Sequence, residues 1–566
     1  MKKMYLVLLA FIGLVNIANA QAPSWQWAKQ AGGIPDEDGN AVVTDASGNS
    51  YVTGSFHSST ISFGSVSVAN TSGAYGASNV YVAKLDPNGN GIWVKGFGGN
   101  TAFNGNGTGT GIAIDGSGNL YITGLFTGTG MTFGSTTLTT NDTSAYSVGE
   151  IFITKLDGSG NVMWAKSAGG AVQEMPTGIC VDASSNVFIT GYFVSSVITF
   201  ESTTLTSTNN SGLYADDVFI AKYNSSGSLQ WAKIAGGSSL DLAKSISVDP
   251  SGNPIIAGYF GLGGATFGST TLTSTAAANL FLVKYDGSSG NVTWAQTATA
   301  TGSGSINHYA YGVSTDGSGN IYMTGTYASS TLTFGGTVTL TGGNIYVAKY
   351  DAAGTVVWVR SASGGLVSTD IVADAVGNTY TVGYYTGTTA IFGTDTITNF
   401  DSSGSNEDIF AAKYDASGTE QWAKSAGGTA RDIANGVAVD LNGNAFVAGY
   451  FNSASSMFDA FTLVIPTPGY SDMFIGKLGA PVGINENEWN NSISAFPNPN
   501  NGLFFVKSEM TISQIEIVNI LGEVIYSEKL NTTETQLDLS KQPKGIYFVK
   551  VISEDNKVAI KKIIVQ

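Results

Sequence analysis

Charge, histidine, arginine and cysteine are all scarce in this sequence. Asp, Glu, Lys and Arg make up 12% of the 566 residues, about half of the usual share. The chain has two histidines and one cysteine, and three scattered residues of these types argue against a zinc site, which takes three or four such ligands. Because Cys180 stands alone, an internal disulfide is excluded, and its apolar neighbours predict a buried and unreactive thiol.

Positive charge is also in short supply. The chain has 25 Lys and Arg against 41 Asp and Glu, which gives a formal net charge of −16. A phosphate backbone needs a basic face, so nucleic acid is excluded as a partner. A sialidase-like activity is excluded in a similar way, because it would need a cluster of arginines and this chain has two.

Long apolar runs are confined to the start of the chain. Lys2 and Lys3 precede the run LVLLAFIGLV, and Ala18-Asn19-Ala20 has the small-residue pattern of a cleavage site. Residues 1–20 are therefore predicted to be a signal peptide, and the mature chain is expected to leave the cytoplasm. No later stretch is long and apolar enough to cross a bilayer, so no transmembrane segment is expected.

The feature that the sequence has in abundance is a repeat. The segment Trp-Ala-Lys-x-Ala-Gly-Gly returns at intervals of 63 to 71 residues, which indicates stacked copies of one structural unit. The 74 glycines, with many Ser, Thr and aromatic residues, suit short strands joined by tight turns. The repeated tryptophans are Trp27, Trp93, Trp164, Trp231, Trp294, Trp358 and Trp422.

Each copy presents its elements in the same order. An apolar run ends in an Asp-x-x-Gly-Asn turn, an alternating strand and about twenty Ser/Thr/Gly/Asn-rich residues follow, and an F-x-A-K strand closes the copy. Seven copies of four strands predict an all-β fold, a seven-bladed β-propeller over residues 21–480. The turn aspartates are Asp45, Asp115, Asp182, Asp249, Asp316, Asp374 and Asp440. The F-x-A-K lysines are Lys84, Lys155, Lys222, Lys284, Lys349, Lys413 and Lys477.

The two ends of the repeat array complement each other. The chain enters at a tryptophan strand and leaves after an F-x-A-K strand, so the first strand would complete the last blade and close the ring. We expect Ser24–Ala31 to pair with Met473–Leu478. The repeat resembles the bacterial β-propeller repeat called SBBP, which implies a secreted or surface propeller and supplies no family-wide catalytic residues.

The repeated aspartates and lysines are expected to be structural. One carboxylate per turn is too few for a calcium site, and an Asp that binds the backbone of its own turn explains the pattern more simply. The lysines are expected to lie along aromatic faces and to pair with these aspartates. Residues 21–484 contain 15 basic residues: seven are these lysines, six follow the tryptophans, and only Lys244 and Arg431 lie outside this plan.

A binding face is expected where the copies differ most, after the Ala-Gly-Gly segment. Asp36, Glu37 and Asp38 form the densest acidic cluster there, which we interpret as a solvated loop, with a calcium site as the weaker alternative. No other cofactor is expected. The Ser/Thr/Asn-rich loops suit contacts with a glycan or a protein and equally suit plain surface.

The composition changes after residue 480. Residues 481–493 indicate a linker, and short alternating strands in residues 494–566 predict a small β-sandwich. This segment resembles the C-terminal sorting domain of the type IX secretion system of Bacteroidetes, which implies that secretion machinery as a partner and export through the periplasm to the cell surface or medium. The residues that carry the resemblance are Pro497, Asn498, Pro499, Gly522, Gly545, Tyr547, Lys561 and Lys562.

Catalytic motifs are missing from the array. His57 and His308 lie in different copies, and neither accompanies a G-x-S-x-G elbow, so a Ser–His–Asp relay is not expected. The sequence therefore predicts a binding or adhesion scaffold for glycan, matrix or protein. Two alternatives stay open: a carbohydrate-active enzyme with a carboxylate pair at the channel mouth, and a purely structural envelope protein.

Overall fold

The computed structural model describes the propeller region and the C-terminal segment with several gaps. The described residues are 23–71, 77–99, 106–140, 149–208, 216–273, 276–301, 307–465, 467, 469–479, 493–519, 523–553 and 558–566. The predicted signal peptide, all but the last residue of the predicted linker, and Gly522 lie outside them. Two compact units, residues 1–481 and 482–566, divide the chain within the predicted linker, and each is described by itself.

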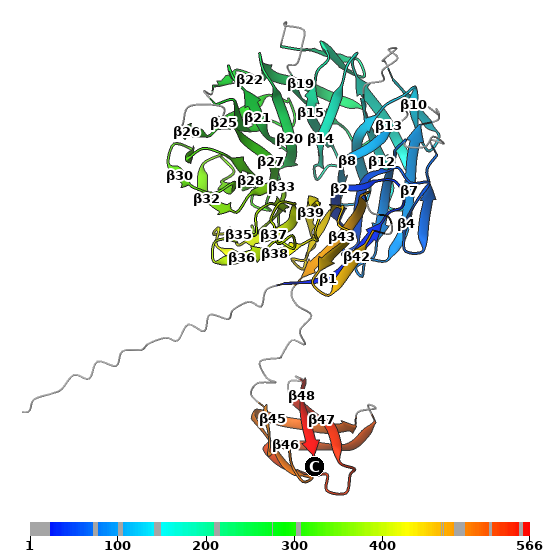
Figure 1. Ribbon diagram of the computed structural model, residues 1–566, viewed down its shortest axis with the longest axis vertical. Coiled ribbons are helices and arrows are strands. Elements are labelled where there is room, and N and C mark those ends of the chain that lie inside the picture. Colours follow the sequence, from blue (N-terminus) through cyan, green and yellow to red (C-terminus); the bar gives the residue numbers. More distant parts are fainter. Residues whose placement is uncertain are drawn as a thin grey trace, which may run out of the picture. The chain divides into compact units, whose positions relative to one another are not determined.

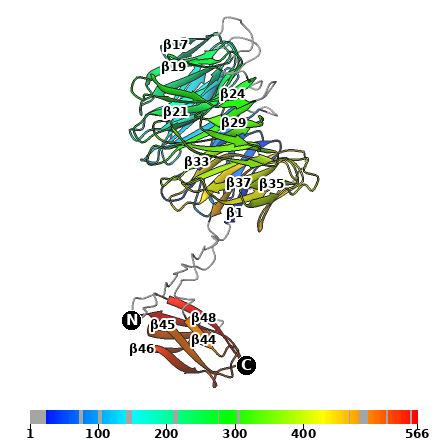
Figure 2. The same cartoon turned by 90° about the vertical axis from the view of Figure 1, so that its left-hand side faces the viewer.

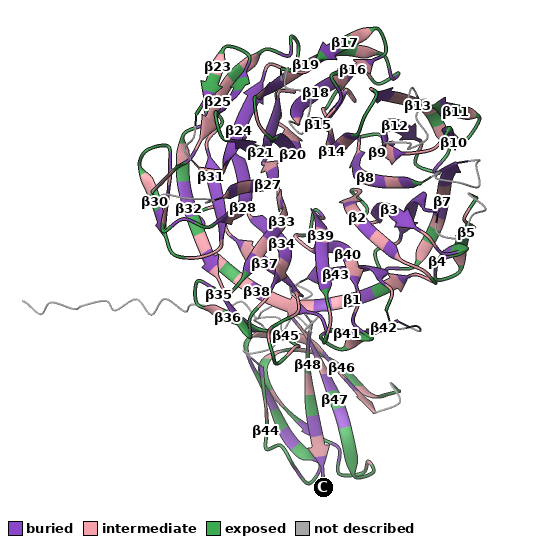
Figure 3. Ribbon diagram, turned by 45° about the horizontal axis from the view of Figure 1, so that its top comes forward, coloured by how far each residue is buried: buried purple, intermediate pink, exposed green. Residues whose placement is uncertain are grey.

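Four-stranded antiparallel groups make up the first unit, and the described residues contain seven of them. The seven inner strands contact one another around a common centre (Figures 1 and 3). They are β2 (Glu37–Thr44), β8 (Gly107–Ile114), β14 (Glu174–Val181), β20 (Asp241–Val248), β27 (His308–Thr315), β33 (Leu366–Ala373) and β39 (Asp432–Val439). We name each group by its inner strand.

Outward from the centre, each group adds three strands by antiparallel pairing. The second strands are β3 (Ser50–Phe56), β9 (Leu120–Phe126), β15 (Val187–Phe193), β21 (Pro254–Gly261), β28 (Ile321–Tyr327), β34 (Thr379–Tyr385) and β40 (Ala445–Phe451). The third strands are β6 (Asn79–Leu85), β12 (Glu150–Leu156), β18 (Asp217–Tyr223), β24 (Ala278–Tyr285), β31 (Ile345–Tyr350), β37 (Asp408–Tyr414) and β43 (Asp472–Gly479). The fourth strands carry the repeated tryptophans: β7 (Gly91–Gly99), β13 (Val162–Gly169), β19 (Leu229–Gly237), β25 (Val292–Thr297), β32 (Val356–Ser363), β38 (Glu420–Ala426) and β1 (Ser24–Ala31).

The first strand of the chain completes the last group. β1 pairs antiparallel with β43, with Trp27 opposite Lys477 and Ala31 opposite Met473. The resulting sheet has the order β1-β43-β40-β39, so strands from the two ends of the array share one set of hydrogen bonds. This confirms the predicted pairing of Ser24–Ala31 with Met473–Leu478. The exposed edges that an open array would leave are thereby joined.

The Ser/Thr-rich segments were expected to be loops, and this expectation was wrong for their first half. Each folds into a short hairpin: β4 (Thr60–Phe63) with β5 (Val66–Ala69), β10 (Gly130–Phe133) with β11 (Thr136–Thr139), β16 (Val197–Phe200) with β17 (Thr203–Thr206), β22 (Ala265–Phe267) with β23 (Thr270–Leu272), β29 (Thr331–Phe334) with β30 (Val338–Thr341), β35 (Thr389–Phe392) with β36 (Asp395–Thr398), and β41 (Ser455–Phe458) with β42 (Phe461–Val464). A further short strand, β26 (Thr299–Thr301), pairs with β29.

A repeated phenylalanine explains these hairpins. The Phe that ends the first hairpin strand is buried in every copy and packs on an aromatic ring of its own third strand. Phe133 and Phe152, for example, have ring centroids 4.9 Å apart, and Phe200 and Phe219 are 5.3 Å apart. The second strand of each hairpin contacts the fourth strand of its own group. In four hairpins the first strand pairs with the fourth strand of the preceding group and so covers the outer edge of that sheet.

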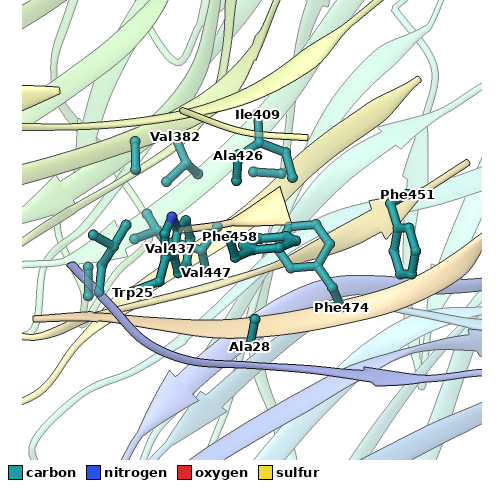
Figure 4. Packing of buried hydrophobic residues seen from close by; sticks show 14 of the residues in the cluster. Trp25, Ala28, Val382, Ile409, Ala426, Val437, Val447, Phe451, Phe458 and Phe474 are labelled. Carbon is teal, nitrogen blue, oxygen red and sulfur yellow. The ribbon is translucent and has the colours of Figure 1, made fainter. Parts of the chain in front are cut away.

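The hydrophobic core lies between neighbouring groups rather than inside one. One cluster joins the β33 and β39 groups, where Ile409 and Val382 face Val447 and Phe474 (Figure 4). Most second and third strands are buried along nearly their whole length (Figure 3). Both faces of each sheet are therefore covered by the adjacent groups, as in a propeller.

Polar contacts also tie each group to the next one. The Trp164 Nε1 and Lys155 Nζ donors both bind the carbonyl oxygen of Ser225, at 3.2 and 3.3 Å, in the turn of the following group. The same joint recurs with Gly287 O, which accepts from Lys222 and Trp231, and with Ala416 O, which accepts from Lys349 and Trp358. The two most regular residues of the repeat therefore act across the group boundary.

The predicted surroundings of the F-x-A-K lysines are confirmed in part. Six of the seven ammonium groups lie 4.8 to 5.2 Å from the centre of an aromatic ring; Lys284 does not. Among the described residues four pair with their turn aspartate: Lys84 with Asp45, Lys155 with Asp115, Lys284 with Asp249 and Lys477 with Asp440. Each of these turn aspartates also accepts hydrogen bonds from the backbone of its own turn, as predicted; Asp45 accepts from the amides of Ser47 and Asn49.

The second unit contains one sheet of five strands around a single core. They are β44 (Ile493–Phe496), β45 (Leu503–Asn519), β46 (Val524–Asp538), β47 (Gly545–Ser553) and β48 (Val558–Val565), several of which Figure 2 labels. The first half of β45 pairs with β44 and the second half with β47, while β46 follows both halves. Residues 503–519, where the sequence predicted short strands, thus form the single long strand β45.

A glycine substitution tests the joint between groups. Gly227 has φ of +81°, and a Cβ atom there would lie 2.8 Å from the Trp164 ring. We expect Gly227→Ala to destabilise the protein by about 1–3 kcal/mol in chemical denaturation. Gly116→Ala is the matched control, since its φ is not in the left-handed region and nothing lies within 4 Å of the new Cβ. Equal stability of the two variants would contradict this account.

Candidate functional site

The inner strands enclose a small central cavity. Its volume is about 190 Å³, and residues from all seven inner strands line it. Each inner strand has a β-bulge at its fourth residue, where the pairing with the second strand shifts by one. A bulge re-aims a side chain, and all seven bulged side chains line the cavity. We call them the bulge ring: Asn40, Thr110, Thr177, Lys244, Tyr311, Thr369 and Asn435.

Five members of the bulge ring link neighbouring inner strands. Thr177 Oγ1, for example, donates to Ala243 O at 2.9 Å, and Asn435 Nδ2 donates to Gly39 O at 3.1 Å. The acceptor is always the carbonyl that precedes the bulged residue of the next inner strand. Lys244 and Tyr311, on the adjacent strands β20 and β27, make no such link within the described residues. The ring is therefore interrupted over one arc.

Six tyrosines from five of the seven groups lie toward the end of the cavity at which the inner strands begin. We call this end the channel mouth and the set the tyrosine rim: Tyr192, Tyr259, Tyr309, Tyr311, Tyr384 and Tyr450. All six are partly exposed. Four come from the sixth residue of a second strand, opposite the second residue of the inner strand, and two come from β27.

The rim is continuous beside the interruption of the bulge ring. The rings of Tyr259 and Tyr309 meet edge to face, with centroids 4.6 Å apart, and Tyr311 lies 5.7 Å from Tyr309. The Lys244 ammonium lies 5.5 Å from the centre of the Tyr192 ring and 5.7 Å from that of Tyr259. Cations over aromatic faces are held electrostatically, so these groups form one connected patch.

Charged groups of both signs complete the mouth. Arg431 Nε lies 3.7 Å from Glu407, and both influence the pKa values of Tyr384 and Tyr450. Lys244 and Arg431, the two basic residues that have no repeated position in the array, thus both lie at the channel mouth. The divergent segments after Ala-Gly-Gly contribute residues to the channel mouth, as the sequence predicted. The rim tyrosines on the second strands were not predicted, and the only sign of them in the sequence is that this position varies between copies.

The acidic cluster Asp36–Asp38 is not the solvated loop that the sequence suggested. Glu37 begins strand β2 and is fully buried, where it accepts hydrogen bonds from the amides of Gly33 and Ser58. Asp36 accepts from the Ser471 amide at 2.7 Å, and Asp38 from the Ser55 hydroxyl at 3.4 Å. Alternation along the strand points these carboxylates in different directions. Among the described residues, no group of three or more His, Cys, Asp or Glu could hold a metal ion.

Glu37 belongs instead to a set of buried carboxylates at the boundaries between groups. The first residue of an inner strand meets an acidic residue at the start of the preceding third strand, in the pairs Glu37–Asp472, Asp241–Asp217 and Asp432–Asp408. All six side chains are at most 1% exposed. Burial raises the pKa of Glu37, Asp241 and Asp408 to about 7, and that of Asp432 and Asp472 to about 6.

The Ala-Gly-Gly segment accommodates these carboxylates. A Cβ on Gly236 would lie 1.9 Å from Asp217 Oδ1, and the amide of Gly237 donates to Asp241 at 2.6 Å. Two carboxylates that are hidden from solvent present no surface to a substrate. The repeated acid after Ala-Gly-Gly and the acid before F-x-A-K are readable in the sequence, but their meeting is a tertiary contact.

Where they are described, the predicted sorting residues lie on the last two strands, β47 and β48, and on the segment that binds β48. Asn498 donates to Lys562 O at 2.7 Å and accepts from the Ile564 amide at 2.9 Å, so the segment around Pro497 and Pro499 is fixed to β48. The Tyr547 hydroxyl donates to Pro543 O at 2.6 Å. Lys561 and Lys562 are on β48, and Gly545 begins β47.

Family comparisons identify two modules. Residues 494–566 match the secretion system C-terminal sorting domain, and residues 26–55 and 421–454 match the β-propeller repeat called SBBP. The chain carries an SBBP-type propeller and a type IX sorting domain. The sorting domain implies that this propeller is secreted or displayed on the cell surface. Within the described residues, no helix has the length and apolar character of a membrane span.

Two curated proteins share shorter regions with the chain. An uncharacterized WD repeat-containing protein of Acanthamoeba polyphaga mimivirus is 25% identical over 380 residues, 56% of this chain and 27% of that protein. Ulvan lyase NLR42 of Nonlabens ulvanivorans is 30% identical over 76 residues, 13% of this chain and 14% of that protein. The chain thus spans about a quarter of the first relative and about a seventh of the second.

Two of the solved structures to which the chain is similar are WD40 domains of low sequence identity. The RRP9 WD40 repeats align over 81% of this chain and 99% of that chain, with a TM-score of 0.41 and 8% identity. The Neurospora crassa Pan2 WD40 domain aligns over 82% of this chain and 97% of that chain, with a TM-score of 0.37 and 7% identity.

The buried carboxylates at the boundaries between groups predict how the stability of the protein depends on pH. Because their pKa values are raised in the folded state, that state keeps protons that the unfolded chain has already lost above about pH 4. Stability should therefore fall as the pH rises from about 4 to about 7, and then level off. Asn79 and Asn279 occupy the same position as Asp472 and Asp408 in other groups, so asparagine fits there.

The double variant Asp472→Asn, Asp408→Asn should show a smaller decrease in stability between about pH 4 and pH 7 than the parent. Relative to the parent it should gain about 1–3 kcal/mol per site at pH 8 and little at pH 4, measured by denaturant titration at both pH values. Asp157→Asn is the control, since Asn224 stands in the equivalent exposed turn. An unchanged pH dependence in the double variant would refute the assignment.

Proposed function

We propose that the protein is an exported binding scaffold that holds a neutral glycan at its channel mouth. The observation that carries this proposal is the tyrosine rim, six partly exposed rings with charged hydrogen-bonding groups between them. Aromatic faces bind the apolar faces of sugar rings, and nearby carboxylates and cations bind their hydroxyl groups. The mouth has three carboxylates and two cationic side chains, which favours a neutral ligand over an acidic one. The carboxylates are Asp38, Asp216 and Glu407, and the cations are Lys244 and Arg431.

The proposal includes the finer architecture. We infer that the seven four-stranded groups form one closed seven-bladed propeller, supported by the β1–β43 pairing and by contacts between all neighbouring inner strands. The bend of β45, whose halves pair with different strands around one core, supports a sandwich for the C-terminal unit. The signal peptide and the sorting domain would act in sequence, first for passage into the periplasm and then for passage across the outer membrane.

The catalytic alternative has less support. A glycosidase needs two carboxyl groups that face the substrate, and the three carboxylate pairs Glu37–Asp472, Asp241–Asp217 and Asp432–Asp408 are buried at the boundaries between groups. The match to ulvan lyase covers too little of either protein to transfer its activity. A binding function makes use of the rim as it is, and it requires neither catalytic group nor metal.

Rim variants test the proposed glycan binding. The purified chain would be screened against immobilised neutral and acidic polysaccharides, and both retention and released oligosaccharide would be measured. We expect retention without release, and a loss of at least about tenfold in affinity for Tyr450→Ala and Tyr384→Ala. Tyr450→Phe keeps the ring face and should retain most of the affinity. Released product, or full affinity in both alanine variants, would overturn the proposal.

Deletion of the sorting domain tests the proposed route. A chain that ends at residue 481 should still enter the periplasm but should no longer reach the surface or the medium, because the C-terminal signal is missing. Fractionation and surface proteolysis of cells that express both forms would show this. Surface display of the truncated chain at the level of the full chain would contradict a role of residues 494–566 in export.

A further inference from the structure

The interruption of the bulge ring is the most distinctive feature of the channel mouth. Five bulged residues use their side-chain donor to bind the next inner strand, whereas Lys244 and Tyr311 leave the carbonyls of Ala310 and Ser368 without this link. We infer that Lys244 and Tyr311, together with Asp216, form the subsite that determines specificity for one neutral sugar ring with vicinal hydroxyl groups. This inference rests on the proposed function.

The surroundings of Lys244 leave its donors available. Among the described residues its ammonium makes no hydrogen bond and no ion pair, and its neighbours are the rings of Tyr192 and Tyr259. Burial lowers the pKa of Lys244, and the nearby Asp216 carboxylate opposes this effect. An ammonium that is partly removed from water without hydrogen bonds is held at a cost in free energy. A ligand hydroxyl oxygen would supply the missing acceptor.

Asp216 makes the subsite suitable for a neutral sugar. Its carboxylate can accept from one hydroxyl group while the ammonium donates to the oxygen of the next, since each hydroxyl is both donor and acceptor. An acidic sugar would instead bring a second carboxylate close to Asp216, whose own pKa is already raised by burial. The edge-to-face rings of Tyr259 and Tyr309 provide an apolar surface beside this pair.

The size of the central cavity limits what enters it. Its volume of about 190 Å³ is below the roughly 300–1,000 Å³ of typical ligand pockets. That space suits one sugar ring and excludes a folded oligosaccharide, so the rest of a glycan would extend over the rim. Tyr311 belongs both to the rim and to the cavity wall, and its hydroxyl binds Thr326 of β28 in its own group instead of the next inner strand, β33.

A substitution that repairs the ring separates ligand binding from stability. Lys244→Thr introduces the residue found at Thr110, Thr177 and Thr369, which can donate to Ala310 O. The full chain would be titrated calorimetrically with cellohexaose, laminarihexaose, mannohexaose, xylohexaose and hexagalacturonate. We expect at least a tenfold loss of affinity for the neutral probe that the parent binds best, with unchanged or higher thermal stability. Lys166→Thr, which removes the same charge at the outer edge beside Glu201, should bind like the parent.

The outcomes distinguish the subsite from the function on which it rests. If Lys244→Thr binds like the parent while Tyr450→Ala does not, the subsite inference is wrong and the proposed function stands. If the parent binds none of the five probes, both are overturned. If hexagalacturonate binds more tightly than every neutral probe and Lys244→Thr removes that preference, the inference of a neutral sugar is wrong, and Lys244 binds a carboxylate of the ligand.

Discussion

The joint between neighbouring strand groups is the contact on which the rest of the structure depends. A tryptophan and a lysine of one group donate to the same turn carbonyl of the next, and the glycine of that turn lies against the tryptophan ring. Neither partner could form this contact inside a single repeat. Since the apolar clusters also lie between groups, a single repeat would leave its core open. Closure through β1 then provides the last group with the same neighbours as all the others.

This arrangement explains why so few charged residues occur in the propeller. Both faces of each sheet are covered by other sheets, so almost every basic residue has a structural partner: a turn carbonyl, an aromatic face or a turn aspartate. A basic residue without such a structural partner therefore points to a functional site. Lys244 and Arg431 have no such place in the repeat, and both lie at the channel mouth beside tyrosines. In a repeat protein, departure from the repeat is where a specific ligand can be bound.

The β-bulge offers the physical means for that departure. A bulged residue contributes little to the ladder of its own sheet, so its side chain can change without loss of strand pairing. Five groups use the position to connect inner strands, and two adjacent groups carry a lysine and a tyrosine there. The fold thus tolerates a functional residue at each of these positions at the loss of about one interstrand hydrogen bond, roughly 0.5–1.5 kcal/mol.

The sequence by itself determined the repeat, the strand order, the pairing of the two ends and the sorting domain. These follow from local periodicity and from motif residues such as Trp27 and Lys477, which recur at fixed spacing and need no knowledge of distant contacts. Only the tertiary structure decided that the Ser/Thr-rich segments contain hairpins, because the burial of Phe133 and its equivalents depends on a third strand. It likewise decided that Glu37 is buried against Asp472, and that tyrosines from separate copies meet around one opening. Such sites join residues from different copies of the repeat, and their geometry is set by how the sheets pack rather than by any spacing along the chain.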